Sequence, residues 1–484
     1  MMMGRKCLVN LLVLICVQLA VLSQKPVVEV NVGTYLGDEQ RNFYGDKAPE
    51  KLDTIWRLYL GEGISPAYGN PNKLWKGAGW TGQPLVVEED GHPYLIQGAF
   101  DYHLKKIDAE TGEIIWQYKF DDILKGTGTI WHNKNAQSKD EEYVIIQGSR
   151  RGVKNTINSK YCESLRAVSY FTGKELWRMN VKQTRSYSRD VDGSALVVND
   201  TGYLALENGL FTVFDPNPQD VEMRDGMMQP KIYKEIPFFE MADTIIHGGN
   251  IESESSPCLL NGRVYTTAGS GRVYGYNISK GAVDWVFEIG ADLNGSPTVT
   301  YDSCLLIPVE KQYIEGKGGV FKLDPSKSPN EAVVWYFPVE DKEWFHWEGG
   351  IVGSIGINDR YVGSDDTHCA AFIGVDGFLY VVDHENMMDG VVVTGSDNKT
   401  LYHTPVSMLK EPIGGTISTP IIVGNKLIAP LDKGLYLYEY DETGNFSLLD
   451  VIEDIQIDAT PVCYKGRLYV ASYDGYLYCL GEKE

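Results

Sequence analysis

The sequence predicts an all-β protein, an eight-bladed β-propeller of four-stranded antiparallel blades. Three observations lead to this fold class: one strand-like element recurs eight times, a Gly turn and a Trp follow several copies at constant spacing, and the last copy lacks its final strand. Repeats of about 40 to 60 residues made of short strands are typical of propellers. A β-sandwich does not predict eight copies of one unit, and solenoid repeats are usually shorter.

The clearest part of each repeat is its third strand, in which side chains alternate at the period of two that a strand requires. The eight copies lie at residues 104–108, 165–169, 209–215, 271–277, 319–324, 377–383, 434–441 and 475–480. Each copy is expected to belong to one blade.

The elements that flank the third strand support the same repeat. After three copies, an Asp, Ser or Asn begins a tight turn that ends in Gly, and a Trp follows four residues later. Such side chains can bond local N–H groups, and Gly accepts a positive φ. Ser-Pro or Thr-Pro opens the first strand at residues 256–257, 296–297, 419–420 and 460–461, where Pro costs little.

The two chain ends indicate how the ring closes. The last copy ends at Leu480 with neither the Gly turn nor the Trp, whereas residues 54–60 read as a fourth strand without a blade. Pairing the N- and C-terminal segments would complete the eighth blade and remove exposed sheet edges.

These repeats resemble the pyrroloquinoline-quinone-like (quinoprotein-like) propellers, whose consensus is Gly-x-Leu-Tyr-Ala-Leu-Asp-x-x-Thr-Gly-x-x-x-Trp. The resemblance covers roughly residues 50 to 484. It implies that Trp116, Trp177 and Trp285 dock each blade against its neighbour. The family contains quinone-dependent alcohol and sugar dehydrogenases as well as non-enzymatic scaffolds, among them the lipoprotein that helps assemble outer-membrane barrels, and the fold alone does not choose between them.

The N-terminus has the pattern of a signal peptide. Arg5 and Lys6 precede an apolar run over residues 8–22, and cleavage before Gln24 fits the small residues there. A membrane anchor is the alternative, but the run is short for a span. We therefore expect a signal peptide at 1–23, an N-terminal extension at 24–50 and the propeller at 51–484, in an exported, periplasmic or secreted protein without a transmembrane segment.

Charge and cysteine content narrow the function classes. The net charge is −22 and becomes −24 without Arg5 and Lys6, which argues against nucleic acid as a partner. Six cysteines remain after the signal peptide, scattered among strand-like segments with no adjacent pair, so that free thiols and disulfides both stay open. They are Cys162, Cys258, Cys304, Cys369, Cys463 and Cys479.

The sequence offers little support for catalysis. Many dehydrogenases of the resembled family stack their quinone on an adjacent-cysteine disulfide, which this chain lacks. Oxygen ligands for a calcium ion exist at Glu252, Glu254, Asn294 and Glu310, but acidic residues are common here. We expect no cofactor, with pyrroloquinoline quinone and calcium as the alternative. Residues 365–368 are expected to be a solvated loop of the sixth blade rather than a cation site.

The remaining functional signal is the set of segments that lead into the first strand of each blade, which converge at the mouth of a propeller's channel. Their mixture of aromatic and polar side chains suits a protein or glycan partner. The expected ligand-binding residues are Trp80, Gln83, Trp131, His132, Arg189, His247, Glu252, Asn294, His346, Trp347 and Asp458. These aromatic residues could equally plug the channel. The sequence thus favours a non-enzymatic binding or scaffolding module over a quinone-dependent oxidoreductase or, third, a hydrolase or lyase acting on sugars.

Overall fold

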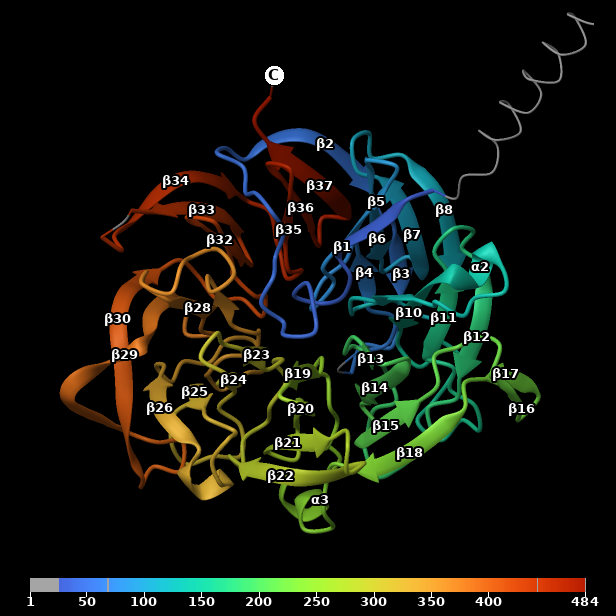
Figure 1. Ribbon diagram of the computed structural model, residues 1–484. Helices are drawn as coiled ribbons and strands as arrows, with labels where there is room; N and C mark the ends of the chain where they lie inside the picture. The colour runs from blue at the N-terminus through green and yellow to red at the C-terminus, as the bar shows by residue number, and fades with distance from the viewer. Residues whose placement is uncertain (1–25, 68, 442, 484) are drawn as a thin grey trace, which may run out of the picture.

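Each repeat folds into one four-stranded antiparallel sheet, and eight such sheets surround a central channel (Figure 1). The structure is a computed structural model that describes residues 26–67, 69–441 and 443–483. The predicted all-β, eight-bladed propeller is confirmed. The predicted signal peptide at 1–23 lies outside the described residues.

The first four blades follow one another along the chain, each with its first strand nearest the channel. Blade 1 has β5 (Leu85–Glu89), β6 (His92–Gly98), β7 (His103–Asp108) and β8 (Ile114–Lys119), and blade 2 has β9 (Thr129–His132), β10 (Tyr143–Gly148), β11 (Leu165–Ser169) and β12 (Glu175–Met179). Blade 3 has β13 (Leu196–Val198), β14 (Thr201–Ala205), β15 (Leu210–Phe214) and β18 (Ile232–Pro237), and blade 4 has β19 (Cys258–Leu260), β20 (Arg263–Ala268), β21 (Arg272–Asn277) and β22 (Ala282–Glu288).

The next three blades continue the ring. They comprise, for blade 5, β23 (Thr298–Val299), β24 (Leu305–Val309), β25 (Gly319–Leu323) and β26 (Val333–Pro338); for blade 6, β27 (Gly356–Ile357), β28 (Cys369–Ile373), β29 (Phe378–Thr394) and β30 (Leu401–Pro412); and for blade 7, β31 (Ile421–Val423), β32 (Lys426–Leu431), β33 (Gly434–Tyr440) and β34 (Phe446–Glu453). The connections carry the hairpins β3 (Glu62–Ile64) with β4 (Leu74–Lys76) and β16 (Glu222–Arg224) with β17 (Met227–Gln229), and the short helices α2 (Lys139–Glu142), α3 (Asp243–Ile246) and η1 (Pro329–Glu331).

The eighth blade is assembled from both ends of the chain. It combines β35 (Val462–Tyr464), β36 (Arg467–Ala471) and β37 (Tyr476–Gly481) with β2 (Asp53–Tyr59) as its outermost strand. Thr54 lies opposite Leu480, and Tyr59 lies opposite Tyr476. The predicted closure is confirmed. A further strand, β1 (Val28–Val32), pairs with β5 at the inner edge of blade 1.

Tryptophans of the fourth strands join neighbouring blades. The indole N–H groups of Trp116, Trp177 and Trp285 donate to the carbonyls of Tyr170, Pro216 and Lys327 of the following blade, at 3.0, 3.0 and 3.1 Å. Trp56 and Trp335 make the same contact with Ala109 and His384, at 3.1 and 2.9 Å. Aromatic burial combined with a satisfied N–H is a strong joint between sheets.

The glycine of the tight turn has a packing role as well. Gly173 has a φ of +69°, and a Cβ at this position would lie 2.7 Å from the indole of Trp116. The turn therefore needs Gly both for its backbone conformation and for the close approach of the preceding blade's Trp.

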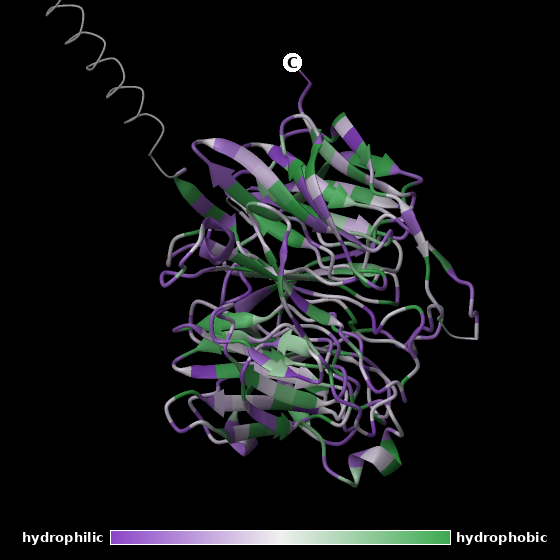
Figure 2. Ribbon diagram, turned by 90° about the vertical axis from the view of Figure 1, so that its right-hand side faces the viewer, coloured by the Kyte–Doolittle hydropathy of each residue, from purple (hydrophilic) through white to green (hydrophobic). Residues whose placement is uncertain are grey.

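Hydrophobic clusters lie between adjacent blades, and hydrophobic and hydrophilic residues alternate along the strands in the view of Figure 2. All six cysteines from Cys162 to Cys479 are buried and free. In the described part of the chain, no helix has the length and apolar character to span a membrane.

The N-terminal extension enters the ring, as the blue trace near the centre of Figure 1 shows. Buried Arg41 donates to the carbonyl of Pro257 at 2.9 and 2.7 Å and to that of Tyr35 at 2.8 Å. The Tyr35 hydroxyl lies 2.9 Å from Thr419 Oγ1 and 3.4 Å from Thr460 Oγ1. The segment 34–42, called the plug below, thus fills the channel at the level of the first strands.

Candidate functional site

A cavity of about 870 Å³ lies at the channel mouth, beside the plug. Residues from the lead-in segments of all eight blades line it, which is the convergence expected of a closed ring. In these segments Glu252 lines the cavity, and Pro257, five residues later, contacts the plug. Asp458 and Thr460 repeat this arrangement in blade 8. The plug therefore closes the channel below the cavity.

Seven of the residues expected at the site line this one cavity. They are Trp80, His247, Glu252, Asn294, His346, Trp347 and Asp458. The cavity brings them together from five different lead-in segments, although they are spread over most of the chain.

Four expected residues lie elsewhere. Buried Gln83 bonds the plug, since its Oε1 accepts from Leu36 N at 2.7 Å. Trp131 and His132 belong to β9 itself rather than to its lead-in; Trp131 is buried, and His132 stacks on Tyr143 with ring centroids 4.5 Å apart. Arg189 is buried and donates to the carbonyls of Val181, Ile157 and Ser159.

The cavity also contains residues that the sequence analysis did not single out. Lys73, Lys125, Asp292, Tyr313 and Tyr473 are among them. Asp292 lies two residues before Asn294 in a lead-in segment, so its position could have indicated it. Tyr313 lies in the connection from β24 to β25, which a search restricted to lead-in segments cannot find.

Aromatic residues form the outer wall of the cavity, and three of them have a strained backbone. Trp80, Tyr313 and Phe345 have φ values of +57°, +67° and +53°, in the left-handed region that side chains other than Gly rarely adopt. Phe345 is 75% exposed between Trp344 and Trp347, whose rings stack 5.5 Å apart. Strain of this kind concentrates at functional sites, because the surrounding structure must hold it in place.

The inner wall is acidic. Glu252, Asp292 and Glu310 are buried, and their described surroundings provide no basic partner in an ion pair. Neutral donors hold one oxygen of each: Tyr187 bonds Glu252, Asn250 bonds Asp292 at 2.8 Å, and Asn294 bonds Glu310 at 3.0 Å. We call Glu252, Asp292 and Glu310 the carboxylate triad.

Burial and mutual repulsion raise the pKa values of these groups. Burial raises the pKa of Asp292 to about 6, although the hydrogen bond from Asn250 opposes the change. Burial, followed by the charge of Asp292, raises the pKa values of Glu252 and Glu310 well above the ordinary value. Burial likewise raises the pKa of Asp458, on another part of the wall, to about 7. Ionising the whole wall is therefore costly unless a cation enters.

A second acidic group, Asp192, Glu207 and Glu254, has oxygens close enough together to hold a metal ion. This group already has a cation, because the Lys125 ammonium forms an ion pair with buried Asp192. Asp190 next to it is paired with Arg150 at 2.7 Å. One of its three carboxylates is thus paired with a cation, whereas the described residues provide no ion pair for the carboxylate triad.

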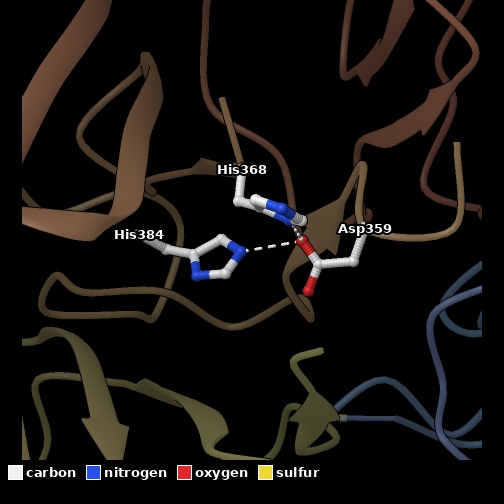
Figure 3. A group of neighbouring side chains, drawn as sticks. All are labelled: Asp359, His368 and His384. Carbon is white, nitrogen blue, oxygen red and sulfur yellow. Dashed lines mark hydrogen bonds and ion pairs between the residues drawn. The ribbon is translucent and has the colours of Figure 1, made fainter. Parts of the chain in front are cut away.

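A histidine cluster lies in blade 6, outside the cavity. Asp359 Oδ1 accepts from His368 Nδ1 and from His384 Nε2, both at 2.8 Å (Figure 3). The Lys322 ammonium lies 3.3 Å from His384 Nδ1, so this nitrogen is an acceptor and Nε2 carries the hydrogen. A metal ligand would need a bare Nε2, and the cluster therefore fits a hydrogen-bond network better than a metal site. Asp365 and Asp366 of the same loop are exposed.

The comparisons with known proteins agree on the fold. Residues 162–327 match the family model described as outer membrane protein assembly factor BamB. The crystal structure of BamB from Moraxella catarrhalis has a TM-score of 0.55 and 13% identity, over 89% of this chain and 100% of that one. No curated protein matches the chain.

Two oxidoreductases are similar to the same extent. Quinohemoprotein alcohol dehydrogenase from Comamonas testosteroni has a TM-score of 0.56 and 12% identity, over 94% of this chain and 81% of that one. A europium-containing methanol dehydrogenase has a TM-score of 0.54 and 11% identity, over 93% and 98%. At such identities the likeness shows the fold alone, so the function must be argued from the site.

Proposed function

Because this chain is an eight-bladed propeller of pyrroloquinoline-quinone-like repeats, we propose that it is an exported, non-enzymatic binding or scaffolding module whose partner is a protein. The partner would dock at the mouth of the central cavity. The observation that carries this proposal is a cavity with an exposed aromatic wall and an acidic interior for which the described residues provide no ion pair.

The aromatic wall supports a protein partner. Trp, Tyr and Phe are enriched at the energetically dominant positions of protein interfaces. Tyr187 is 52% exposed and Tyr313 is 41% exposed beside the still more exposed Phe345. The strained backbone at Phe345 presents an apolar side chain to solvent, an arrangement that stability alone does not favour.

The residues of the cavity do not fit the quinone. Pyrroloquinoline quinone carries three carboxylates and needs cationic partners, yet in the part of the chain that the structure describes, no Arg lines this cavity. Lys125 is already paired with Asp192, and Lys73 faces a wall that includes Glu252, Asp292, Glu310 and Asp458. Bringing a trianion against these carboxylates would be strongly unfavourable without several additional cations.

Export rests on the sequence alone. The pattern of residues 1–23 is typical of a cleaved signal peptide, and the acidic composition fits a protein that does not encounter nucleic acid. N-terminal sequencing of the protein secreted by its native host should begin at Gln24.

Photo-crosslinking tests the proposed interface. A photoreactive phenylalanine at position 345 should crosslink one defined protein from the native host, whereas the same residue at Ile115 on β8, 50% exposed, should not. Equal crosslinking at both positions would contradict the site. If the wild-type chain captures a glycan and Trp347→Ala does not, the partner is a carbohydrate and the proposed protein partner is wrong. If the chain oxidises alcohols or sugars in a dye-linked assay with quinone and calcium, it is an oxidoreductase and the proposed binding function is wrong.

A further inference from the structure

Three oxygens of residues that line the cavity lie close to one glycine, Gly269. A Cβ at Gly269 would lie 3.1 Å from the carbonyl oxygen of Glu252 and 3.2 Å from both Asn250 Oδ1 and Asp292 Oδ1. A side chain at this position would therefore crowd the three oxygens. We call these three oxygens the oxygen cradle.

The side-chain oxygens of the cradle have no donor. Asn250 Oδ1 and Asp292 Oδ1 lack a hydrogen-bond partner in the described part of the chain, as does the neighbouring Glu252 Oε2. Asn250 is 8% exposed, and Asp292 and Glu252 are each 4% exposed. The orientation of the Asn250 amide is fixed, because its Nδ2 donates to Asp292 Oδ2 and a rotated amide would place oxygen against oxygen. Buried acceptors without a donor are rare and costly, which indicates a missing ligand that donates.

The charge of the cradle specifies a cation. Among the described residues the carboxylate triad has no ion-pair partner, in contrast to Asp190 and Asp192, which are paired with Arg150 and Lys125. The same cavity already accommodates one ammonium group, since Lys73 Nζ lies 3.7 Å from the ring centroid of Trp75. An aromatic wall of this kind attracts a cation through the face of its rings.

The donors around the triad distinguish an ammonium ion from a metal ion. Asn250 and Asn294 direct their NH₂ groups at Asp292 and Glu310, and the Tyr187 hydroxyl is directed at Glu252. Each carboxylate thus has one oxygen already engaged, whereas a calcium ion requires six to eight oxygens, often with bidentate carboxylates. A primary ammonium group needs only three acceptors, and it has three hydrogens to offer.

We propose that the oxygen cradle and the carboxylate triad receive a primary ammonium group, presented by a lysine side chain of the protein partner or by a free small amine. The lysine source rests on the function proposed above; the ammonium chemistry does not. The apolar stem of the lysine would lie along the aromatic wall while its ammonium group donates to Asp292, Asn250 and Glu252. The ion would also neutralise the repulsion within the triad.

Calorimetric titration tests the recognition directly. Nα-acetyl-lysine methylamide, 1,5-diaminopentane, the uncharged Nα-acetyl-norleucine methylamide and calcium chloride are titrated separately into the full chain. The lysine derivative should bind at least about tenfold more tightly than the norleucine derivative, because a desolvated charge pair is lost in the latter. Diamine binding without lysine-derivative binding would assign the source to a free amine.

Two variants and one control locate the site. Asp292→Asn removes a cradle charge, and Gly269→Ala places a methyl group among the three oxygens; each should weaken amine binding about tenfold or more. Glu288→Gln changes the charge equally at the outer strand of blade 4, where Glu288 is exposed, and should leave binding unchanged. Melting curves of all variants establish that they are folded.

The outcomes separate this inference from the proposed function. Absence of amine binding, or calcium binding that Asp292→Asn abolishes, would overturn the ammonium site even if a protein is crosslinked at position 345. Amine binding that is lost in Asp292→Asn, without any crosslinked protein, would support the ammonium site and leave the proposed protein partner refuted.

Discussion

Replacing Asp292 by Asn should stabilise the folded protein, although the residue is buried and hydrogen-bonded. Its pKa is raised from 3.8 to about 6, mainly by burial, so the folded chain holds this proton more tightly than the unfolded chain does. Ionised Asp292 consequently costs the fold up to ~3 kcal/mol relative to the unfolded chain. Asparagine cannot ionise, and it keeps an oxygen that can accept from Asn250.

The sign of the pH dependence follows from this difference. Below pH 3.8 the carboxyl is protonated in both states, and the cost is absent. It develops as the pH rises and is complete above a pH of about 6, so the stability of the wild type relative to the variant falls across this window. Removing the charge also relieves Glu252 and Glu310, whose pKa values Asp292 raises.

Denaturant unfolding of both proteins at a series of pH values between 4 and 8 measures the effect. The variant should gain little at the acidic end and up to ~3 kcal/mol at pH 7 to 8. Glu288→Gln, which removes an exposed charge, should show no such trend. A variant that is less stable by the same amount at every pH would refute the reasoning, because it would mean that the hydrogen bond outweighs the charge.

Three further expectations concern the blades and the mouth. Trp347→Ala should abolish partner binding while the melting temperature stays near that of the wild type. Trp335→Ala, at a fully buried joint between blades 5 and 6, should instead lower the free energy of unfolding by about 3–5 kcal/mol, measured by chemical unfolding. A large loss of stability in the Trp347 variant would show that Trp347 is a packing residue. Gly173→Ala should lose about 1–2 kcal/mol from its positive φ and more from contact with Trp116, which thermal melting will detect. A chain that starts at Pro66 lacks β2 and the plug and should melt far below the full chain; an unchanged transition would contradict closure by the chain ends.

The fold could be predicted because the pattern of strands and turns repeats along the sequence. Each blade repeats the same strand alternation, several add the turn glycine and the Trp, and the gap left after Leu480 identified residues 54–60 as the closing strand. The plug could not be predicted in this way, because residues 34–42 occur once and match no repeat. Arg41 illustrates the difficulty: a charged residue is expected at the surface, and only the folded ring brings the carbonyl of Pro257 to its guanidinium group.

The site could be predicted where the start of the first strand was correctly placed. Asp458 and Asn294 precede their strands by a few residues, and both line the cavity. In blade 2 the strand begins at Thr129, so Trp131 and His132 lie within β9, beyond the mouth. The prediction for Arg189 was wrong for another reason. Its lead-in segment was correctly placed, but its side chain bonds the carbonyls of nearby loops, and Tyr187 of the same segment lines the cavity instead.

The plug determines what kind of partner the cavity can accept. An extended peptide could pass through an open channel, but Tyr35 and Arg41 bond residues at the first strands of several blades. The plug therefore closes the channel below the cavity. A ligand must therefore enter and leave through the aromatic mouth, and only a side chain or a small molecule can reach the carboxylate triad. The triad destabilises the fold when it is ionised, and two buried side-chain oxygens of the cradle have no protein donor among the described residues. Both costs diminish when a cation that donates hydrogen bonds is bound. The same buried acidic groups that lower the stability of the free protein thus give the bound state its selectivity for a positive charge.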